Sequence, residues 1–195
     1  MPRPSNKAIR RQEIIRGLMS VMATTGYENA SIQAIAKAAG LAPGLIHYHF
    51  KNKKEILIEL VNLVIRTMEE RFLARCKDAS SPAQKIDAFV EAALALGDDA
   101  DEELVAAWVM IASEAMRHED IQKLYENVIK QNTLLLASLL QEYTQGSKSE
   151  MKKIAVMCIA SIEGLYQLSQ TTKDILPSGF AADTLKNLVF SSLTP

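Results

Sequence analysis

The chain has 195 residues, 48% of them hydrophobic and 23% charged, enough for one compact unit or two small domains. Its formal net charge of −1 divides into +7 for residues 1–54, with nine basic and two acidic residues, and −8 for residues 55–195, with thirteen and twenty-one. Its two cysteines, Cys76 and Cys158, lie far apart and form no C-x-x-C pair, which argues against a disulfide framework or a zinc ribbon. We therefore expect a basic head over 1–54 that binds phosphates and an acidic body over 55–195.

No targeting or membrane-spanning segment is expected. The first residues show no basic stretch followed by an apolar core, as a signal peptide would. The longest uninterrupted apolar run, 104–112, is too short to cross a bilayer. Together with the sparse cysteines, these features predict a cytoplasmic protein without a membrane partner.

A flexible arm is predicted over residues 1–6, which contain two prolines and no apolar pattern. Arg3 and Lys7 are candidates for contacts with a DNA backbone or minor groove, as in the arms of other helix-turn-helix proteins. The alternative is a disordered start with incidental charge.

A helix is predicted next, over about 7–25, and Gly26 ends it. Its core-facing residues are Ile14, Leu18, Val21 and Met22.

The stretch 31–54 predicts two short helices joined by a glycine turn. Ser31 can cap the first helix, and Gly40, which tolerates a positive φ, ends it. Pro43 suits the first turn of the second helix, where its missing N–H costs nothing. The apolar residues of both helices recur at helical spacing: Ile32, Ile35, Ala36, Ala39, Leu41, Leu45 and Ile46. This pattern is typical of a helix-turn-helix.

The exposed side of the second helix is short, aromatic and basic, as in a DNA recognition helix. His47, Tyr48 and His49 offer hydrogen-bond donors to base edges, whereas the lysines that follow suit phosphates. Asn52 and Glu55 form an N-x-x-E capping pattern, so a new helix is predicted to start at Asn52. The alternative is an ordinary helical hairpin with a solvated basic edge. The candidate DNA contacts are Ser31, Gln33, Pro43, Gly44, His47, Tyr48, His49, Lys53 and Lys54.

This head resembles the N-terminal domain of the tetracycline-repressor (TetR) family of bacterial transcription regulators. The resemblance covers roughly the first quarter of the chain. It rests on Gly26-Tyr27, Ser31-Ile32, Ala36, Ala39-Gly40-Leu41, Gly44, His47-Tyr48-His49-Phe50 and Lys53-Lys54-Glu55. The Pro43-Gly44 start and the His-Tyr-His-Phe end are most similar to the BetI-like branch. The resemblance implies a repressor that a small-molecule effector releases from a palindromic double-stranded DNA operator.

The sequence of the body predicts helices only, because no window shows the sustained alternation of apolar and polar residues that is typical of a β-strand. A long helix over about 52–77 is expected to belong to both head and body. Ser81 and Pro82 start another helix, and the acidic residues of 97–101 precede one that carries the apolar run 104–112. Further helices are predicted over about 121–143, 151–172 and 180–193, with breaks at His118–Asp120, Gly146–Ser149 and Pro177–Gly179. The fold class is therefore all-α, with about nine helices.

The resemblance implies that the body is a ligand-binding and dimerisation domain. In the family, the last two helices of two subunits form a four-helix homodimer interface, and here both helices are apolar on more than one side. The alternative is that they are core helices of a monomer.

An effector site is expected between the helices after Asn52. A buried glutamate in such a site would favour a cationic or hydrogen-bond-donating ligand. For each candidate residue the alternative is plain core packing. The candidate ligand-binding residues are Trp108, Met110, Glu114, Met116, Tyr125, Cys158, Glu163 and Tyr166.

Catalysis is not indicated. The sequence lacks G-x-S-x-G, P-loop, G-x-G-x-x-G and H-E-x-x-H motifs, and it has three histidines. His47 and His49 are two residues apart on a helix and point in different directions, which is poor geometry for chelating a metal. Neither a metal site nor a cofactor is expected. The alternative from another class is a non-enzymatic helical protein whose basic head binds a protein or a membrane surface.

Overall fold

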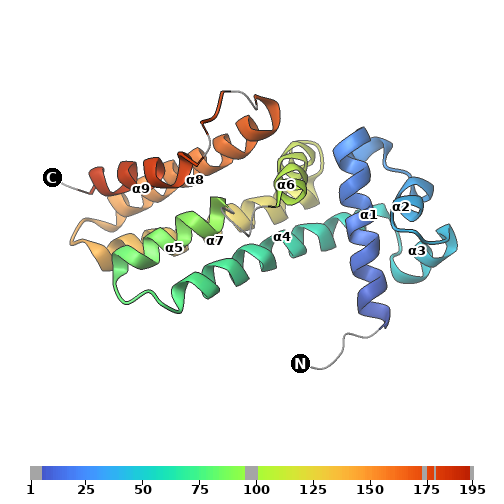
Figure 1. Ribbon diagram of the computed structural model, residues 1–195, viewed down its shortest axis with the longest axis horizontal. Coiled ribbons are helices and arrows are strands. Elements are labelled where there is room, and N and C mark those ends of the chain that lie inside the picture. Colours follow the sequence, from blue (N-terminus) through green and yellow to red (C-terminus); the bar gives the residue numbers. More distant parts are fainter. Residues whose placement is uncertain (1–5, 95–100, 173–174, 178, 194–195) are drawn as a thin grey trace. The chain divides into compact units, whose positions relative to one another are not determined.

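The computed structural model describes residues 6–94, 101–172, 175–177 and 179–193, and these residues form nine α-helices and no strand (Figure 1). The predicted all-α class is therefore confirmed. The helices are α1 (Asn6–Asn29), α2 (Ile32–Ala38), α3 (Pro43–His49), α4 (Lys53–Cys76), α5 (Pro82–Leu94), α6 (Glu102–Ala115), α7 (Glu119–Tyr143), α8 (Lys148–Thr171) and α9 (Ala181–Ser191). Arg3, Ser178 and most of the predicted break over 97–101 lie outside the described residues.

Packing divides the chain into two compact units. Unit 1 holds the described residues up to Val64 together with Glu102–Leu124, and unit 2 holds the described residues of 65–101 and 125–195. This division does not follow the predicted boundary after residue 54. The reason is that α6, which is distant in sequence, packs against α1 and so belongs to the unit of the head. Helices α4 and α7 each have residues in both units.

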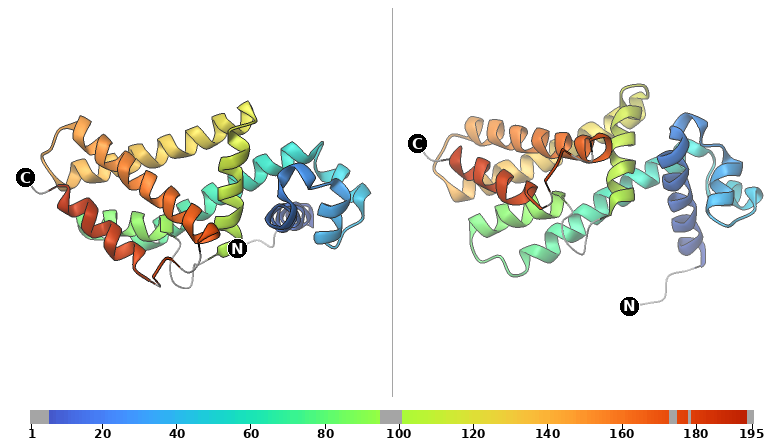
Figure 2. Two further views of the ribbon diagram at one scale, coloured as in Figure 1. Left: turned by 90° about the horizontal axis from the view of Figure 1, so that it is seen from above. Right: turned by 45° about the horizontal axis from the view of Figure 1, so that its top comes forward.

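Unit 1 is built around α1, which packs against α2, α3 and α6 (Figures 1 and 2). The buried face of α1 repeats at helical spacing and consists of Ile14, Ile15, Leu18, Met19, Val21 and Met22. Gly17 lies on this face, and a Cβ added there would stand 2.8 Å from the carbonyl oxygen of Ile35 on α2. Gly26 interrupts α1 with φ 75° and ψ 165°, so the regular helix stops where the sequence predicts.

Unit 2 has a second core, in which α9 packs against α5 and α8 (Figures 1 and 2). Helix α5 starts as predicted, because the Ser81 hydroxyl accepts a hydrogen bond from the Gln84 N–H at 3.3 Å and Pro82 takes the first helical position. The core side chains are Ile86, Phe89, Val90, Ala93, Leu136, Leu139, Leu140, Met151, Ala155, Cys158, Ile159, Ile162, Leu185 and Val189.

Local capping explains where α8 begins. It starts at Lys148, three residues before the predicted start, because Ser147 and Glu150 form a capping box. The Glu150 N–H donates to the Ser147 hydroxyl at 3.2 Å, and the Ser147 hydroxyl and N–H donate to the Glu150 carboxylate, which lowers the pKa of that carboxyl group. Among the described helices, none is both long enough and apolar enough to cross a membrane.

Candidate nucleic-acid interface

The turn between α2 and α3 is fixed by backbone hydrogen bonds and caps. The Ser31 hydroxyl accepts from the backbone N–H three residues later at 3.1 Å and so caps α2. Gly40 has φ 66°, which allows the Leu41 N–H to return to the Ala36 carbonyl at 2.9 Å. Pro43 occupies the first position of α3. The predicted helix-turn-helix is therefore present, with its cap, glycine turn and proline start.

Arg11 holds α3 in place from α1. Its Nη1 donates to the backbone carbonyl of His49 at 2.7 Å, and its guanidinium lies over the Phe50 ring, 4.1 Å from the ring centroid. Its Nη2 is also 3.4 Å from a carboxylate oxygen of Glu59 on α4. Sequence reasoning did not single out Arg11, because its partners lie far along the chain and leave no local pattern.

The exposed side of the helix-turn-helix carries six of the nine predicted DNA contacts. These are Ser31, Gln33, Pro43, Gly44, His47 and Tyr48. Tyr48 is 76% exposed, although it sits on a helix whose other side is anchored by the fully buried Ile46. An aromatic side chain so exposed on a rigid support is available to contact another molecule.

His49 lies on the inner side of α3 and not with this exposed group. It is 8% exposed, and its Nδ1 has no hydrogen-bond partner. The physical reason is helical spacing, because a residue three positions after the buried Ile46 shares its face. His49 therefore packs beneath the exposed Tyr48, with the two rings edge to face and their centroids 5.0 Å apart.

Lys53 and Lys54 are engaged within unit 1. The Lys53 ammonium donates to the carbonyls of Tyr27 at 2.7 Å and Glu28 at 3.1 Å, and it lies 4.3 Å from the centroid of the Tyr27 ring. The Lys54 ammonium pairs with the carboxylate of Asp120 on α7. Lys53 thus caps the end of α1, and its predicted phosphate contact stays a prediction. Lys51 and Lys54 are both exposed, whereas Lys53 is partly buried.

The predicted effector residues of unit 1 lie on or just after α6. Trp108 and Glu114 are buried, Met110 is partly buried, and Met116 is 81% exposed. Glu114 faces His118 and Arg117 within the same unit.

The predicted effector residues of unit 2 include one directly bonded pair. The Tyr125 hydroxyl donates to the Glu163 carboxylate at 2.7 Å, and burial together with this bond raises the pKa of Tyr125. The Tyr166 hydroxyl donates to the Ala93 carbonyl, and its pKa is raised by burial and by the nearby charge of Glu163. Tyr125, Glu163 and Tyr166 are thus near one another.

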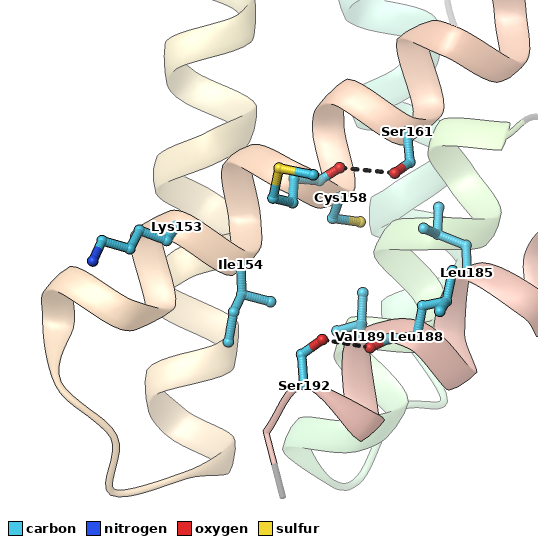
Figure 3. A pocket seen from close by; sticks show the side chains of 9 residues that line it. Lys153, Ile154, Cys158, Ser161, Leu185, Leu188, Val189 and Ser192 are labelled. Atoms are coloured by element: carbon cyan, nitrogen blue, oxygen red, sulfur yellow. Dashed lines mark hydrogen bonds between the residues drawn. The ribbon is translucent and has the colours of Figure 1, made fainter.

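Cys158 lines a different feature, a groove between α8 and α9 (Figure 3). This α8–α9 groove encloses about 350 Å³ and is lined by Lys153, Ile154, Met157, Cys158, Ser161, Leu185, Leu188, Val189 and Ser192. The hydroxyls of Ser161 and Ser192 donate to backbone carbonyls of their own helices at 2.9 Å and 2.8 Å, which leaves the groove predominantly apolar. Met157 and Leu188 are 66% and 59% exposed there. Burial raises the pKa of the Cys158 thiol to about 12.

Two family models match the chain. Residues 14–60 match the bacterial regulatory proteins of the tetR family, and residues 82–193 match the C-terminal domain of BetI-type transcriptional repressors. The chain therefore belongs to the TetR family of bacterial regulatory proteins. Within that family, the match over its body is to the BetI type.

Individual relatives agree with this assignment. The HTH-type transcriptional regulator BetI of Rhizobium meliloti (strain 1021) is 27% identical over 170 residues, which covers 85% of this chain and 80% of that protein. The solved structure of a transcriptional regulator from Rhodococcus sp. Rha1 has the same fold, with a TM-score of 0.80 at 19% identity over 94% of this chain and 95% of that chain. A putative transcriptional regulator from Saccharomonospora viridis in complex with choline has a TM-score of 0.74 at 23% identity over 93% of each chain.

These findings decide between the two functions left open by the sequence. The protein is a ligand-responsive, DNA-binding transcriptional regulator, and a head that binds a protein or membrane surface is not favoured.

Proposed function

We propose that the protein is a homodimeric repressor that binds a palindromic operator and leaves it when an organic cation binds the body. The observation that carries the proposal is the exposed face of α3, with His47 and Tyr48 held outward on a buried anchor. As a regulator of operator DNA, it acts in the bacterial cytoplasm and has no catalytic role.

On the DNA side, His47 and Tyr48 contact base edges, and Ser31, Gln33, Pro43 and Gly44 approach the backbone. Lys53 and Lys54 add positive potential while holding neighbouring elements of unit 1. Direct phosphate contacts fall to exposed cations such as Lys37 and Lys51.

A second copy of the chain covers the α8–α9 groove. A recognition helix of seven residues reads too few base pairs to find one site in a genome, so two copies are needed. The exposed apolar side chains of the last two helices support this face as the contact, and they are Val156, Met157, Leu168 and Leu188.

The effector binds in unit 2 beside Tyr125, Glu163 and Tyr166. A carboxylate together with tyrosine rings suits an organic cation, because the carboxylate supplies charge and the ring faces attract ammonium groups. A regulator of the same fold was solved with choline, which makes a quaternary ammonium compound the natural first probe.

Helix α4 is a candidate for the link between effector and DNA. Its 24 residues form one continuous helix with residues in both units, about 36 Å long at a rise of about 1.5 Å per residue. We expect the effector and DNA to favour different conformations of α4. By linkage, the effector then weakens DNA binding by the same factor by which DNA weakens effector binding, typically about 5–150-fold. Release does not require the dimer to dissociate.

The test begins with a footprint of the full-length protein on its own upstream DNA or on a selected operator. A two-fold symmetric footprint and the mass of a dimer are expected, whereas a monomer that protects one half-site would refute the proposal. Choline is then titrated by calorimetry with and without operator, using Glu163→Gln as the variant and Glu126→Gln as the exposed control. Equal choline affinity with and without operator would exclude the coupling. The remaining explanation would then be that regulation depends on the expression level of the protein alone.

A further inference from the structure

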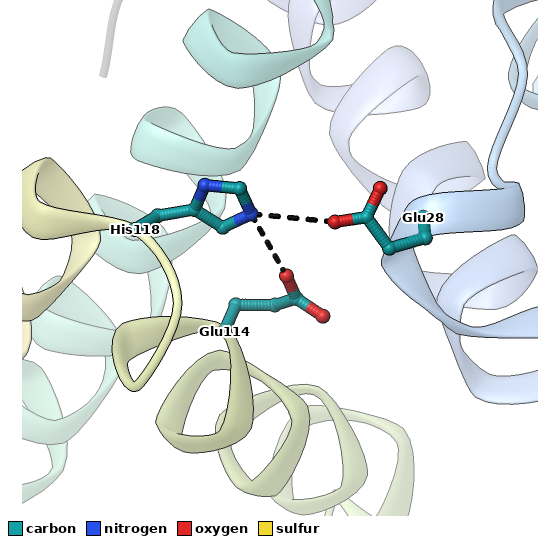
Figure 4. Close-up of side chains that lie close together, drawn as sticks. All are labelled: Glu28, Glu114 and His118. Carbon is teal, nitrogen blue, oxygen red and sulfur yellow. Dashed lines mark hydrogen bonds and ion pairs between the residues drawn. The ribbon is translucent and has the colours of Figure 1, made fainter.

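Three side chains that commonly bind metal ions converge in unit 1 (Figure 4). Glu28 lies near the end of α1, Glu114 near the end of α6, and His118 in the turn between α6 and α7. One ligand atom from each lies within 4.8 Å of the others. His118 Nε2 is 3.3 Å from Glu114 Oε2 and 3.4 Å from Glu28 Oε1. Two helices and a turn thus bring three potential metal-binding side chains together.

Glu114 carries a buried carboxylate oxygen without a hydrogen-bond partner in this group. Its side chain is 7% exposed, and Oε2 has no hydrogen-bond partner. The exposed Arg117 approaches the other oxygen, Oε1, at 3.7 Å. A buried carboxylate is costly unless its oxygens are paired, so the one that faces His118 and Glu28 calls for a positive charge.

A hydrogen bond donated by His118 satisfies this geometry poorly. A single Nε2–H can point at one oxygen, whereas two carboxylate oxygens face this atom at nearly equal distances. Both separations also exceed the usual N–H···O range of about 2.7–3.2 Å. In a tetrahedral zinc site with bonds of about 2.0–2.2 Å, neighbouring ligand atoms stand roughly 3.3–3.6 Å apart. The two separations from His118 Nε2, 3.3 and 3.4 Å, match that edge length, and the two carboxylate oxygens lie within 4.8 Å of each other.

We propose that Glu28, Glu114 and His118 bind a divalent transition-metal ion such as Zn²⁺, with water completing the coordination. One imidazole and two carboxylates form an N,O donor set that suits Zn²⁺ and also Mn²⁺. Glu28 is 63% exposed in its side chain, which gives the ion a path from solvent, while Glu114 supplies the buried ligand. The ring of Tyr27 meets the His118 ring edge to face, with centroids 6.1 Å apart, and restrains its orientation.

The ion would tie the α6–α7 turn to the end of α1. Glu28 is three residues before Ser31, which caps α2, so the ligand lies next to the start of the helix-turn-helix. Metal binding should therefore raise the unfolding temperature of the protein, since the folded state holds the three ligands together. This inference rests on unit 1 alone and stands whether or not the effector proposal holds.

The test uses the full-length protein, stripped with chelator, dialysed, and titrated with Zn²⁺ by calorimetry. One ion per chain is expected, and Co²⁺ should give the visible absorption of a tetrahedral site. Glu28→Gln, Glu114→Gln and His118→Asn should each lower Zn²⁺ affinity by more than about tenfold. Glu119→Gln, an exposed neighbour, and Cys76→Ser should bind as the wild type does.

Two outcomes would overturn the site. One is the absence of saturable binding of Zn²⁺, Co²⁺ and Mn²⁺ by the stripped protein, and the other is equal affinity in the wild type and the ligand variants. Since Glu28 is exposed, Glu28→Gln keeps the question decidable even if Glu114→Gln fails to fold, as checked by circular dichroism.

Discussion

The exposed face of α3 and the α8–α9 groove differ in chemistry, although both lack cover within their own unit. The α3 face is polar and aromatic, with His47 and Tyr48 outward on a helix anchored by Ile46 and by Arg11. The groove is apolar, with Met157 and Leu188 exposed and its serine hydroxyls bonded to backbone carbonyls. Hydrogen-bonding groups suit base edges, whereas apolar groups suit another apolar protein surface. The two faces therefore indicate two different partners.

The largest effect is expected from a charge in the groove. Met157→Glu should convert the dimer to a monomer and lower operator affinity by at least about a hundredfold, because two linked half-sites bind far more tightly than one. Sedimentation and mobility-shift titration measure the two effects. Leu73→Glu, which changes an apolar side chain of similar exposure on α4, is the matched control. A Met157→Glu protein that remains dimeric would place the contact elsewhere.

The next effect separates two neighbouring histidines of α3. His47→Ala should remove about 1–3 kcal/mol of preference between operator and altered bases while leaving stability nearly unchanged. His49→Ala should instead lower the free energy of unfolding by about 1–3 kcal/mol, because it empties a buried position. Competition binding and urea unfolding on both variants decide the assignment. Unchanged base preference in His47→Ala would mean that its side chain does not read DNA.

A third comparison concerns two lysines of the same basic stretch, Lys51 and Lys53. Lys53→Ala should lower stability by about 1–3 kcal/mol, since its ammonium donates to two carbonyls. Lys51→Ala should leave stability intact and flatten the salt dependence of DNA binding by about one unit of slope. The result that contradicts this view is a flattened slope in Lys53→Ala without loss of stability, as expected for a phosphate contact.

A further effect is a pH dependence of unit 2. Burial raises the pKa of Cys158 from 9.0 to about 12, so between these values the unfolded chain loses a proton that the folded chain keeps. The contribution of this thiol to the free energy of unfolding is therefore fully present below pH 9. Above pH 9 it falls as the pH rises, by at most about 1.4 kcal/mol per pH unit. Urea unfolding across this range, compared with Cys158→Ala, isolates the contribution. Parallel curves for the two proteins would argue against a buried, protonated thiol.

Local patterns predicted those parts of the helix-turn-helix that depend on neighbouring residues in the sequence. The cap at Ser31, the turn at Gly40 and the start at Pro43 each depend on residues within a few positions. Helix α4 likewise starts one residue after the predicted Asn52, whose side chain accepts from the Glu55 N–H at 2.9 Å. These features could be predicted because capping acts over three or four residues.

Contacts between distant segments could not be predicted in the same way. Arg11, Lys53 and Glu28 contact partners in segments far along the chain. The packing of α6 against α1 also has no signature in either segment, since an apolar helical face does not specify which helix it meets. For this reason, the two compact units combine segments that are not consecutive in the sequence.

The glycine at position 17 limits how the DNA-reading element can be exchanged between proteins. A methyl group there would meet the Ile35 carbonyl oxygen at 2.8 Å and the Ala39 side chain at 3.0 Å. A graft of residues 31–50 onto another regulator would therefore fit only if the recipient also carries a glycine at the matching place in its first helix. For building chimaeric repressors with new operator specificity, the transferable module is not the two short helices but those helices together with α1.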